Sequence, residues 1–464
     1  MRTLELDGRR VLVIGLGVSG RSAARFCAER GAAVVAVDER PASALGDLDE
    51  LGAAVEVRCA ATLPLPDDEA GTFDLVVPSP GVPHARYANV TAPAWGDVEL
   101  LSRALPDAVR IAAITGTNGK STTTCLVEAM LRTGGLRARA AGNLGDPALG
   151  LVGAPIDVAV LEVSSFQLDT TEAFRPDVAV VLNVTPDHLD RHATLEGYAA
   201  AKARILANQT PDDTAVLAVD DPIVAKLAAS ARARVLAYSR TRPQSAGAWL
   251  DGDSVVLVDP ARGVRARVDL SPLGLEGRHN RDNAAMALCA AVALGVDPAR
   301  ASRAFATFRG LPHRSELVAV VRGVRFVDDS KATNPGAAER SLEGCEGRVV
   351  WIAGGRDKGL DFAPLAEVAA PRVRAALWIG ESAGALEAAM GGAIPSEACG
   401  TLARAVARAA ELAREGDTVL LAPACASFDQ LTSYAHRGEV FRREVLALAG
   451  AAPGAAVADG RDAP

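Results

Sequence analysis

The residues best suited to chemistry lie in the stretch ITGTNGKST, residues 114–122. The apolar run RIAAI before it predicts a strand that leads through a glycine-containing loop into a helix. The N–H groups of such a loop and of the first helical turn bind phosphate oxygens. Lys120 can reach the β- and γ-phosphates of a nucleotide, and a hydroxyl of Ser121 or Thr122 can bind Mg²⁺. We therefore predict a nucleotide-phosphate site, although Ile114 stands where the full pattern G-x-x-x-x-G-K-[ST] has glycine.

A second glycine pattern, GLGVSG, occupies residues 15–20 and follows another apolar run. The spacing G-x-G-x-x-G is the dinucleotide fingerprint, and Asp38 ends the next apolar run, about where an acid would bind a ribose. By themselves these residues favour an NAD-dependent oxidoreductase or redox sensor. The three glycines equally suit another pyrophosphate that approaches the backbone closely, such as that of UDP. The pattern leaves both ligands open.

Further candidate side chains end strand-like runs or lie on expected helices. Glu162 ends the run VAVLE, so its carboxylate lies at the carboxyl end of a strand, where it could bind Mg²⁺. His188 and His192 are four residues apart, but HLDRH lacks the glutamate of the zinc motif H-E-x-x-H. Lys202 lies on a helix predicted to open at Thr194. Taken singly, each has an ordinary alternative as a solvated, capping or loop residue.

The last third of the chain contains several polar loops, each directly after a strand-like run. In parallel sheets such loops meet at one edge and form a crevice. Their cationic, amide and hydroxyl groups suit carboxylates and phosphates. These groups belong to Arg314, Lys331, Thr333, Asn334, Lys358 and Ser427. Asn280 and Asn283, at the start of another expected helix, could bind an adenine edge or cap the helix.

A scaffold of strands and helices must position these side chains. Unbroken β-branched runs such as VLVIG, RIAAIT and TVLLAPA predict parallel strands buried on both faces, and helical stretches between them predict an α/β protein. An Asp-Gly after Leu250 predicts a hairpin. At roughly 150 residues per domain, the length predicts about three domains. We place them at residues 1–99, 100–310 and 311–448, with a flexible tail at 449–464.

The composition limits the class of protein. The formal net charge of −8 argues against a nucleic-acid partner, because a polyanion binder needs a basic surface. Seven scattered cysteines without a C-x-x-C pair indicate free thiols in a reducing compartment. The N-terminus lacks the apolar core of a signal peptide, and the longest uncharged apolar stretch, residues 284–296, is too short to span a bilayer. We expect a cytoplasmic protein, monomeric, with neither membrane nor nucleic acid as partner.

Together the motifs resemble those of the Mur ligases of peptidoglycan synthesis, most closely the member that adds D-glutamate. The matching segments run in order through nearly the whole chain: GLGVSG, SPG, TGTNGKST, AGNLG, LEVSSFQL, NVTPDHLDRH, YAAAKARI, GRHNRDN, LPHR, DDSKATN, GGRDKG and APACASFDQ. The phosphate-loop, glutamate and histidine segments also match folylpolyglutamate ligases. The N-terminal nucleotide-type domain argues against a member of that group. The resemblance implies a Rossmann-like UDP-binding domain, a central P-loop ATPase-type domain and a C-terminal Rossmann-like domain.

The resemblance also implies a ligand for each group of matching residues. The residues implied to bind the phosphates of ATP are Gly116, Thr117, Asn118, Gly119, Lys120, Ser121 and Thr122. The residues implied to bind the rest of ATP are Asn280, Asn283, Arg314 and Asp329. Those for the UDP-linked substrate are Gly15, Gly17, Val18, Ser19, Asp38, Glu39, Arg40, Ser79, Pro80, Gly81 and Asn143. Those for D-glutamate are Lys331, Thr333, Lys358, Ser427 and Tyr434, where the family pattern has Phe at the last position.

Two Mg²⁺ sites and a reaction follow from the same resemblance. Ser121 and Glu162 would hold one ion, and His188 and Lys202 the other, with Lys202 carbamylated so that it presents a carboxylate. Lys120, His188 and Lys202 would be the catalytic residues. The implied substrates are ATP, UDP-N-acetylmuramoyl-L-alanine and D-glutamate. The implied reaction is ATP-dependent amide formation through an acyl phosphate.

Overall fold

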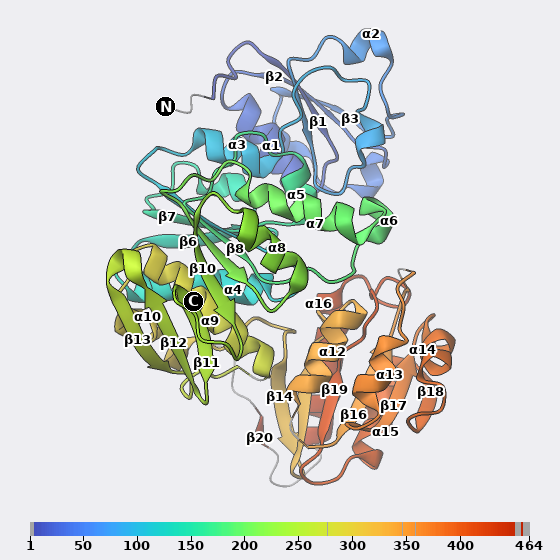
Figure 1. The fold of residues 1–464 in the computed structure, drawn as a ribbon. Helices are drawn as coiled ribbons and strands as arrows, with labels where there is room; N and C mark the ends of the chain where they lie inside the picture. Colours follow the sequence, from blue (N-terminus) through green and yellow to red (C-terminus); the bar gives the residue numbers. More distant parts are fainter. Residues whose placement is uncertain (1–3, 276, 346, 358, 451–455, 458–464) are drawn as a thin grey trace. The chain divides into compact units, whose positions relative to one another are not determined.

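The computed structural model describes residues 4–275, 277–345, 347–357, 359–450 and 456–457. Lys358, which the resemblance links to D-glutamate, lies outside them. The chain divides into two compact units. Unit 1 consists of Met1–Val184, Arg191–Asp269 and Ala284–Ala304, and unit 2 of Thr185–Asp190, Leu270–Asn283 and Phe305–Pro464. The described residues form three sheets (Figure 1), and the prediction of an α/β protein with mostly parallel strands is confirmed.

The first sheet, in unit 1, is wholly parallel and has the strand order β3-β2-β1-β4. Its two central strands are buried almost throughout, as expected of unbroken β-branched runs covered on both faces. The strands are β1 (Arg10–Ile14), β2 (Ala33–Val37), β3 (Val55–Arg58) and β4 (Leu75–Pro78). The helices of this region are α1 (Val18–Ala28), α2 (Asp67–Ala70) and α3 (Asp97–Ala104).

The second sheet, also in unit 1, has the order β13-β12-β11-β10-β9-β8-β5-β7-β6. Its strands are β5 (Arg110–Thr115), β6 (Ala138–Gly142), β7 (Val158–Glu162), β8 (Val178–Val181), β9 (Thr214–Ala218), β10 (Arg234–Ser239), β11 (Gly247–Asp251), β12 (Ser254–Asp259) and β13 (Val264–Asp269). Pairing is parallel from β6 to β11 and antiparallel from β11 to β13. The predicted hairpin is confirmed, because β11 ends and β12 begins on either side of Gly252 and Asp253.

The helices that follow these strands include those expected to carry site residues. They are α4 (Lys120–Thr133), α5 (Ser165–Asp169), α6 (Leu189–His192), α7 (Leu195–Ala203), α8 (Pro222–Ser230), α9 (Arg278–Ala293), α10 (Pro298–Ala301) and α11 (Ala304–Thr307). The hydroxyl of Thr194 accepts a hydrogen bond from the N–H of Gly197, so the predicted start of the Lys202 helix is confirmed. An apolar core runs through unit 1, from Val11 of the first sheet to Leu217 of the second.

The third sheet, in unit 2, has the order β18-β17-β16-β19-β15-β14-β20. Its strands are β14 (Glu316–Val321), β15 (Val324–Asp328), β16 (Val349–Gly354), β17 (Val373–Ile379), β18 (Ser396–Gly400), β19 (Thr418–Leu421) and β20 (Ala456–Val457). Its helices are α12 (Pro335–Gly344), α13 (Pro364–Ala369), α14 (Ala383–Met390), α15 (Leu402–Leu412) and α16 (Tyr434–Gly450). Residues 451–455 and 458–464 of the predicted tail lie outside the described residues.

An antiparallel hairpin, β14–β15, forms one side of this third sheet and is a feature that the sequence did not predict. Its two-residue turn consists of Arg322 and Gly323, both with positive φ. Two-residue hairpins need such backbone angles, which Asn-Gly and Asp-Gly signal most clearly. Arg-Gly carries no such signal, so the turn could not be recognised from residue type.

A buried carboxylate ties α3 to the second half of unit 1. Glu99 is fully buried, and its oxygens accept hydrogen bonds from the backbone N–H groups of Glu172, Ala173 and Phe174 at 2.9–3.1 Å. The Nε of Arg103 donates to it at 2.6 Å. An anionic acceptor is thus shared by three N–H groups of a connecting loop and one guanidinium, which fixes the loop against α3.

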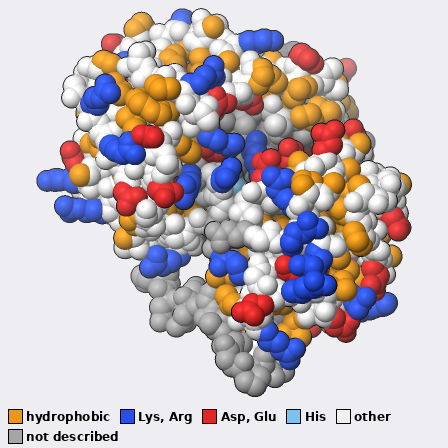
Figure 2. Space-filling view, turned by 60° about the horizontal axis from the view of Figure 1, so that its bottom comes forward, with side chains coloured by type: hydrophobic (Ala, Val, Ile, Leu, Met, Phe, Trp, Pro, Cys, Tyr) orange, Lys and Arg blue, Asp and Glu red, His pale blue; other side chains and the backbone are white. Residues whose placement is uncertain are grey.

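Acidic, basic and apolar side chains are interspersed on the face drawn in Figure 2. Among the helices of the described residues, none combines the length and the apolar character that crossing a membrane requires.

We predict that Glu99→Gln lowers the free energy of unfolding by about 1–3 kcal/mol, because an amide that keeps the acceptor oxygen for the three backbone N–H groups sets its own NH2 donor against the Nε–H of Arg103 and removes the buried charge that pairs with it. Thermal unfolding followed by circular dichroism measures the change. Glu50→Gln, at an ion pair on the surface, is the matched control and should stay within about 0.5 kcal/mol of the parent. Equal effects at the two positions would contradict the role of Glu99.

Candidate active site

The phosphate loop joins β5 to α4 in unit 1 as the sequence predicts. Gly116 has a φ of +154° and Gly119 one of +85°, both outside the range that other residues adopt readily. A Cβ added to Gly116 would lie 2.9 Å from the Cβ of Leu182 on the neighbouring strand connection. Backbone angle and space therefore both require glycine at position 116, which brings the loop close to the sheet.

Two lysines converge on this loop. The Nζ of Lys120 donates to the carbonyl oxygens of Gly116 and Thr117, each at 2.9 Å. The Nζ of Lys202, from α7, donates to the same Gly116 oxygen at 2.8 Å, and the Lys202 side chain is 1% exposed. Two ammonium groups at one carbonyl create strong local positive charge, which suits the oxygens of a polyphosphate.

Glu162, at the end of β7, lies beside the first turn of α4. Its carboxylate accepts hydrogen bonds from the hydroxyl of Ser121 and from the Nδ2 of Asn143, the latter at 2.7 Å. The residue is 1% exposed. A buried carboxylate beside a hydroxyl offers the hard oxygen ligands that Mg²⁺ prefers. The structure thus brings together Ser121, Glu162 and Asn143, three residues singled out from the sequence.

Asn183 supports the phosphate loop and was not singled out from the sequence. Its Oδ1 accepts from the N–H of Asn118 at 2.9 Å, and its Nδ2 donates to the carbonyl of Asn118 at 3.0 Å. Its own carbonyl accepts from the N–H of Thr117. Asn183 follows β8, the strand that pairs with β5. Its position directly after a strand-like run is the sequence feature that could have identified it.

The N-terminal glycine turn has the predicted strand–turn–helix form. Gly15 has a φ of +87°, and a Cβ on Gly20 would lie 1.8 Å from the Gly15 carbonyl oxygen. The hydroxyl of Ser79 donates to that same oxygen at 2.7 Å. Two loops implied to bind the UDP-linked substrate are therefore in contact here. Beside them, Val18 is 64% exposed at the start of α1.

Asp38 is buried and holds the backbone around the turn. Its carboxylate accepts from the N–H of Leu16 at 2.7 Å and from the backbone and guanidinium of Arg40 at 2.8–2.9 Å. The hydrogen bond from Arg40 is the main cause that lowers the pKa of Asp38 to about 2, with a further contribution from Leu16. Next to this pair, Glu39 forms an ion pair with Arg86. Binding of a ribose by Asp38 stays a prediction.

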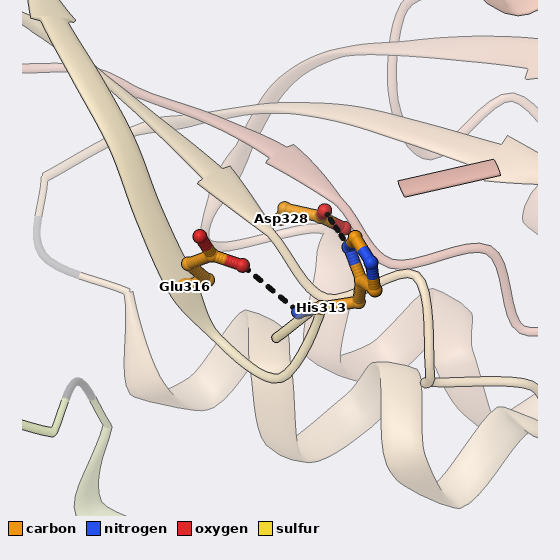
Figure 3. A group of neighbouring side chains, drawn as sticks. All are labelled: His313, Glu316 and Asp328. Atoms are coloured by element: carbon orange, nitrogen blue, oxygen red, sulfur yellow. Dashed lines mark hydrogen bonds and ion pairs between the residues drawn. The ribbon is translucent and has the colours of Figure 1, made fainter. Parts of the chain in front are cut away.

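In unit 2, His313 lies between two acids, as Figure 3 shows. Its Nδ1 hydrogen-bonds to the Oδ2 of Asp328 at 2.8 Å, while its backbone N–H donates to Glu316 at 2.9 Å. These three residues are close enough to hold a metal ion, but Glu316 also pairs with Arg442 and Asp328 also accepts from the N–H of Ser330. The cluster is a hydrogen-bonded support for the loop that begins at Asp328.

Charge around His313 controls its protonation. Burial alone disfavours the imidazolium, but the hydrogen bond and charge of Asp328, together with Glu316, outweigh it and raise the pKa of His313. The next residue, Asp329, is implied to contact ATP. Burial raises its pKa to about 6, partly opposed by a hydrogen bond from Ser341 and by the charge of Arg314.

Of the residues implied to bind D-glutamate, Lys331 and Thr333 follow β15, Ser427 follows β19, and Tyr434 begins α16. The Nζ of Lys331 lies 3.7 Å from the ring centroid of Tyr434. Ser427 is 3% exposed, and its buried hydroxyl has no hydrogen-bond partner among the described residues. A buried hydroxyl in that state costs free energy unless a ligand satisfies it, which favours a polar ligand beside Ser427. Thr333 follows Lys331 on the same tight loop.

Arg437 is a further residue that the sequence did not single out. It is 1% exposed and donates to the carbonyls of Ser330, Cys425, Ala426 and Gly354 at 2.9–3.4 Å. Burial lowers its pKa to about 10. One guanidinium thus joins the loops after β15, β16 and β19. Its position in a helix, far along the chain from two of those loops, gave no local pattern to recognise.

Three more residues predicted from the sequence are Asn280 and Asn283, at the start of α9, and His188, on the segment between β8 and α6. The Nδ2 of Asn283 donates to the Oδ1 of Asn280 at 3.1 Å, and both residues are buried. His188 has a φ of +53°, and its backbone N–H donates to the carboxylate of Asp187 at 3.0 Å. All three belong to unit 2, whereas the phosphate loop, Glu162 and Lys202 belong to unit 1.

Three family models match in the order of the three sheets. They are the Mur ligase MurD-like N-terminal domain at residues 9–98, the Mur ligase middle domain at 114–291 and the Mur ligase glutamate ligase domain at 313–425. The MurF ligase of Thermotoga maritima, solved in complex with ADP, has the same fold, with a TM-score of 0.60 at 19% identity over 95% of this chain and 96% of that one. The chain belongs to the Mur ligase family, and the three-domain prediction is confirmed.

Within that family, two relatives with the same enzyme name match the chain along almost its full length. The UDP-N-acetylmuramoylalanine–D-glutamate ligase of Anaeromyxobacter dehalogenans is 45% identical over 462 residues, covering 96% of this chain and 98% of that protein. The enzyme of the same name from Acidobacterium capsulatum is 43% identical over 464 residues, covering 97% and 98%. The resemblance drawn from the motifs is confirmed.

We predict that part of the stability of unit 2 depends on the charge of His313. Because folding raises the pKa of His313, its contribution is fully present below its ordinary pKa of 6.5 and is lost as the pH rises through the higher folded value. Thermal unfolding of the parent and of His313→Gln at a series of pH values measures this. The parent should lose more stability above pH 6.5 than the variant. His84→Gln, at an exposed histidine, should retain the parent's pH dependence, and parallel curves for the parent and His313→Gln would contradict the prediction.

Proposed function

We propose that this chain is an ATP-dependent ligase that adds D-glutamate to UDP-N-acetylmuramoyl-L-alanine in the synthesis of peptidoglycan precursors. The observation that carries the proposal is the convergence of Lys120 and Lys202 on the Gly116 carbonyl, beside the buried pair of Ser121 and Glu162. This geometry suits the transfer of a phosphoryl group, and the two relatives described above are named as ligases of UDP-N-acetylmuramoylalanine and D-glutamate.

In the first step, a carboxylate oxygen of the alanyl group forms a bond to the γ-phosphorus of ATP. The bond from that phosphorus to the bridging oxygen breaks, and ADP leaves with the electron pair. Lys120 and the N–H groups of the loop that starts at Gly116 bind the phosphate oxygens on which charge accumulates. The product is an acyl phosphate.

In the second step, the amine of D-glutamate attacks the acyl carbon. The tetrahedral intermediate expels inorganic phosphate, the nitrogen loses a proton, and the amide forms. Lys331, Thr333 and Ser427 would orient the amino acid through its carboxylates, since they offer an ammonium group and two hydroxyls. The buried hydroxyl of Ser427, which no described residue satisfies, supports this role.

The donor set also fits Mg²⁺. Ser121 and Glu162 would hold one ion, and His188 with a carbamylated Lys202 the other, since carbamylation converts the amine into a carboxylate ligand. Bound Mg²⁺ neutralises phosphate charge and stabilises the transition state of phosphoryl transfer. The burial of Lys202 and its contact with the Gly116 carbonyl support a role for it within the site.

The organisation and location of the protein complete the proposal. We place the domain bounds at residues 1–99, 100–310 and 311–448, and the three family models fall within them. We infer a monomer in the cytoplasm, where ATP is available. The seven free cysteines support a reducing compartment.

An NAD-dependent oxidoreductase, the alternative raised by GLGVSG, has less support. A MurD-like N-terminal family model includes the turn at residues 15–20, and a UDP pyrophosphate uses the same glycine geometry. Titration with NADH tests this alternative, because binding in the micromolar range would favour it over the ligase.

We predict that phosphate release from ATP requires both UDP-N-acetylmuramoyl-L-alanine and D-glutamate. The physical reason is that the acyl phosphate needs the first substrate to form and the second to be consumed. A coupled phosphate assay with each substrate omitted in turn measures this, with L-glutamate as the stereochemical control. Turnover with L-glutamate, or without an amino acid, would contradict the proposed specificity.

We predict that Lys202→Ala lowers kcat by about 100-fold or more, and that bicarbonate or short-chain carboxylic acids restore part of the activity by supplying the missing carboxylate. Steady-state kinetics with and without added acid measures both effects. Lys226→Ala removes an exposed lysine of α8 and should leave kcat unchanged. Parent-level activity of Lys202→Ala would contradict the carbamate, as would failure of every acid to restore an inactive but folded variant.

A further inference from the structure

The segment Thr185–Asp190 belongs to unit 2, although the chain on both sides of it belongs to unit 1. The N–H of Val184, just before it, donates to the carboxylate of Asp221 at 2.8 Å. Just after it, the guanidinium of Arg191 donates to the carbonyl of Val82 at 2.9 Å. The segment carries His188, so what holds it within unit 2 bears on the site.

One side chain of unit 2 holds this segment. The Nδ2 of Asn334 donates to the Oδ2 of Asp187 at 2.9 Å, and both residues are 5% exposed. The Oδ1 of Asn334 accepts from the N–H of Ala337 at 2.8 Å and so caps α12. Both ends of the Asn334 amide are therefore used, one for the helix and the other for Asp187.

Asp187 in turn fixes the backbone of His188. Its Oδ1 accepts from the His188 N–H at 3.0 Å, while its Oδ2 lies 3.7 Å from the Nε2 of the same residue. His188 has a positive φ of 53°, a conformation that is uncommon for residues other than glycine, although histidine adopts it more often than most, and that hydrogen bonds with neighbouring groups help to hold. Asp187 forms such a hydrogen bond, and Asn334 holds Asp187.

The loop that leads from β15 to Asn334 also carries Lys331 and Thr333, two of the residues implied to bind D-glutamate. Its geometry is tight, since the N–H of Thr333 donates to the carbonyl of Lys331 at 2.8 Å and the N–H of Lys331 to the carbonyl of His313 at 3.1 Å. A displacement of this loop would therefore be transmitted through Asn334 to the segment that carries His188.

We propose that Asn334 and Asp187 are positioning residues that fix His188 relative to the loop of Lys331 and Thr333. The hydrogen bond between a buried amide and a buried carboxylate makes the two segments move as one. The part that concerns D-glutamate rests on the proposed function, whereas the structural coupling does not.

Exchanging the two side chains provides the sharpest test. Asn334→Asp keeps the oxygen that caps α12, because aspartate caps as well as asparagine, but it replaces the donor with a carboxylate that repels Asp187. In the double variant Asp187→Asn/Asn334→Asp, the new amide at position 187 can donate to the new carboxylate at position 334. Its oxygen can still accept from the His188 N–H, and the other carboxylate oxygen can still cap α12.

The first measurement is hydrogen exchange of the full-length protein, followed by mass spectrometry without substrates. In Asn334→Asp we expect peptides covering residues 185–190 to exchange about tenfold faster or more, while amides of α12 keep their protection. The double variant should return to within about threefold of the parent. Unchanged exchange in Asn334→Asp, or no recovery in the double variant, would overturn the coupling.

The second measurement is the KM for D-glutamate in the phosphate-release assay. We expect it to rise about tenfold in Asn334→Asp, with a smaller change in the KM for ATP, and to recover in the double variant. Recovery of exchange without recovery of KM would mean that the carboxylate of Asp187 acts directly on a ligand, and would overturn its assignment as a positioning residue. Should the parent lack D-glutamate-dependent turnover, the proposed function fails, and hydrogen exchange still decides the coupling.

Asp297→Asn is the matched control, because Asp297 caps α10 through its Oδ1 in the same way and lies outside the Asn334–Asp187 pair. This substitution should change neither the rate of hydrogen exchange in residues 185–190 nor the KM for D-glutamate. If it reproduced the effect of Asn334→Asp, the coupling would be overturned in favour of general destabilisation.

Discussion

The carbonyl oxygen of Gly116 receives hydrogen bonds from two ammonium groups, and the rest of unit 1 is arranged to make this possible. Lys120 comes from the first turn of α4, directly after the loop, whereas Lys202 comes from α7, and three strands of the second sheet lie between it and Gly116 along the chain. Only a backbone without a Cβ fits against Leu182 at this point. While both lysines are unmodified, the carbonyl dipole that they share lowers the energetic cost of bringing two like charges together. With Lys202 carbamylated as proposed, Lys120 is the positive charge of this pair that attracts a polyanion.

The same principle, a buried polar atom held by several partners, recurs through the molecule. Glu99 joins a helix to a distant loop, and Arg437 joins three loops of the third sheet. Each is almost inaccessible to water, so its full set of hydrogen bonds is needed to offset the cost of burial. Arg437 fixes loops at the carboxyl ends of parallel strands, which is where this fold places its ligands, whereas the loop that Glu99 holds precedes β8.

Local pattern accounts for much of what could be predicted. The strand–loop–helix around Lys120, the glycine turn at Gly15 and the helix cap at Thr194 depend on residues close together in sequence, so residue type and spacing reveal them. The hairpin of β14 and β15 was not predicted from the sequence, because its Arg-Gly turn lacks the residues that usually mark a two-residue turn. Asn183 was not predicted because its role depends on hydrogen bonds to the backbone of Asn118, in the connection that follows a neighbouring strand. Sequence periodicity does not encode such a contact.

The sequence by itself determined the class of fold, the phosphate loop and the family resemblance, because these follow from contiguous runs of residues. Only the tertiary structure decided which distant side chains meet: Lys202 with Lys120 at one carbonyl, Asn143 with Ser121 at the carboxylate of Glu162, and Asn334 with Asp187. It also decided that Asp38, expected to face a ribose, is engaged by Leu16 and Arg40. The physical reason is that such contacts depend on strand order and helix packing, which are set by burial across the whole chain and not by any one segment.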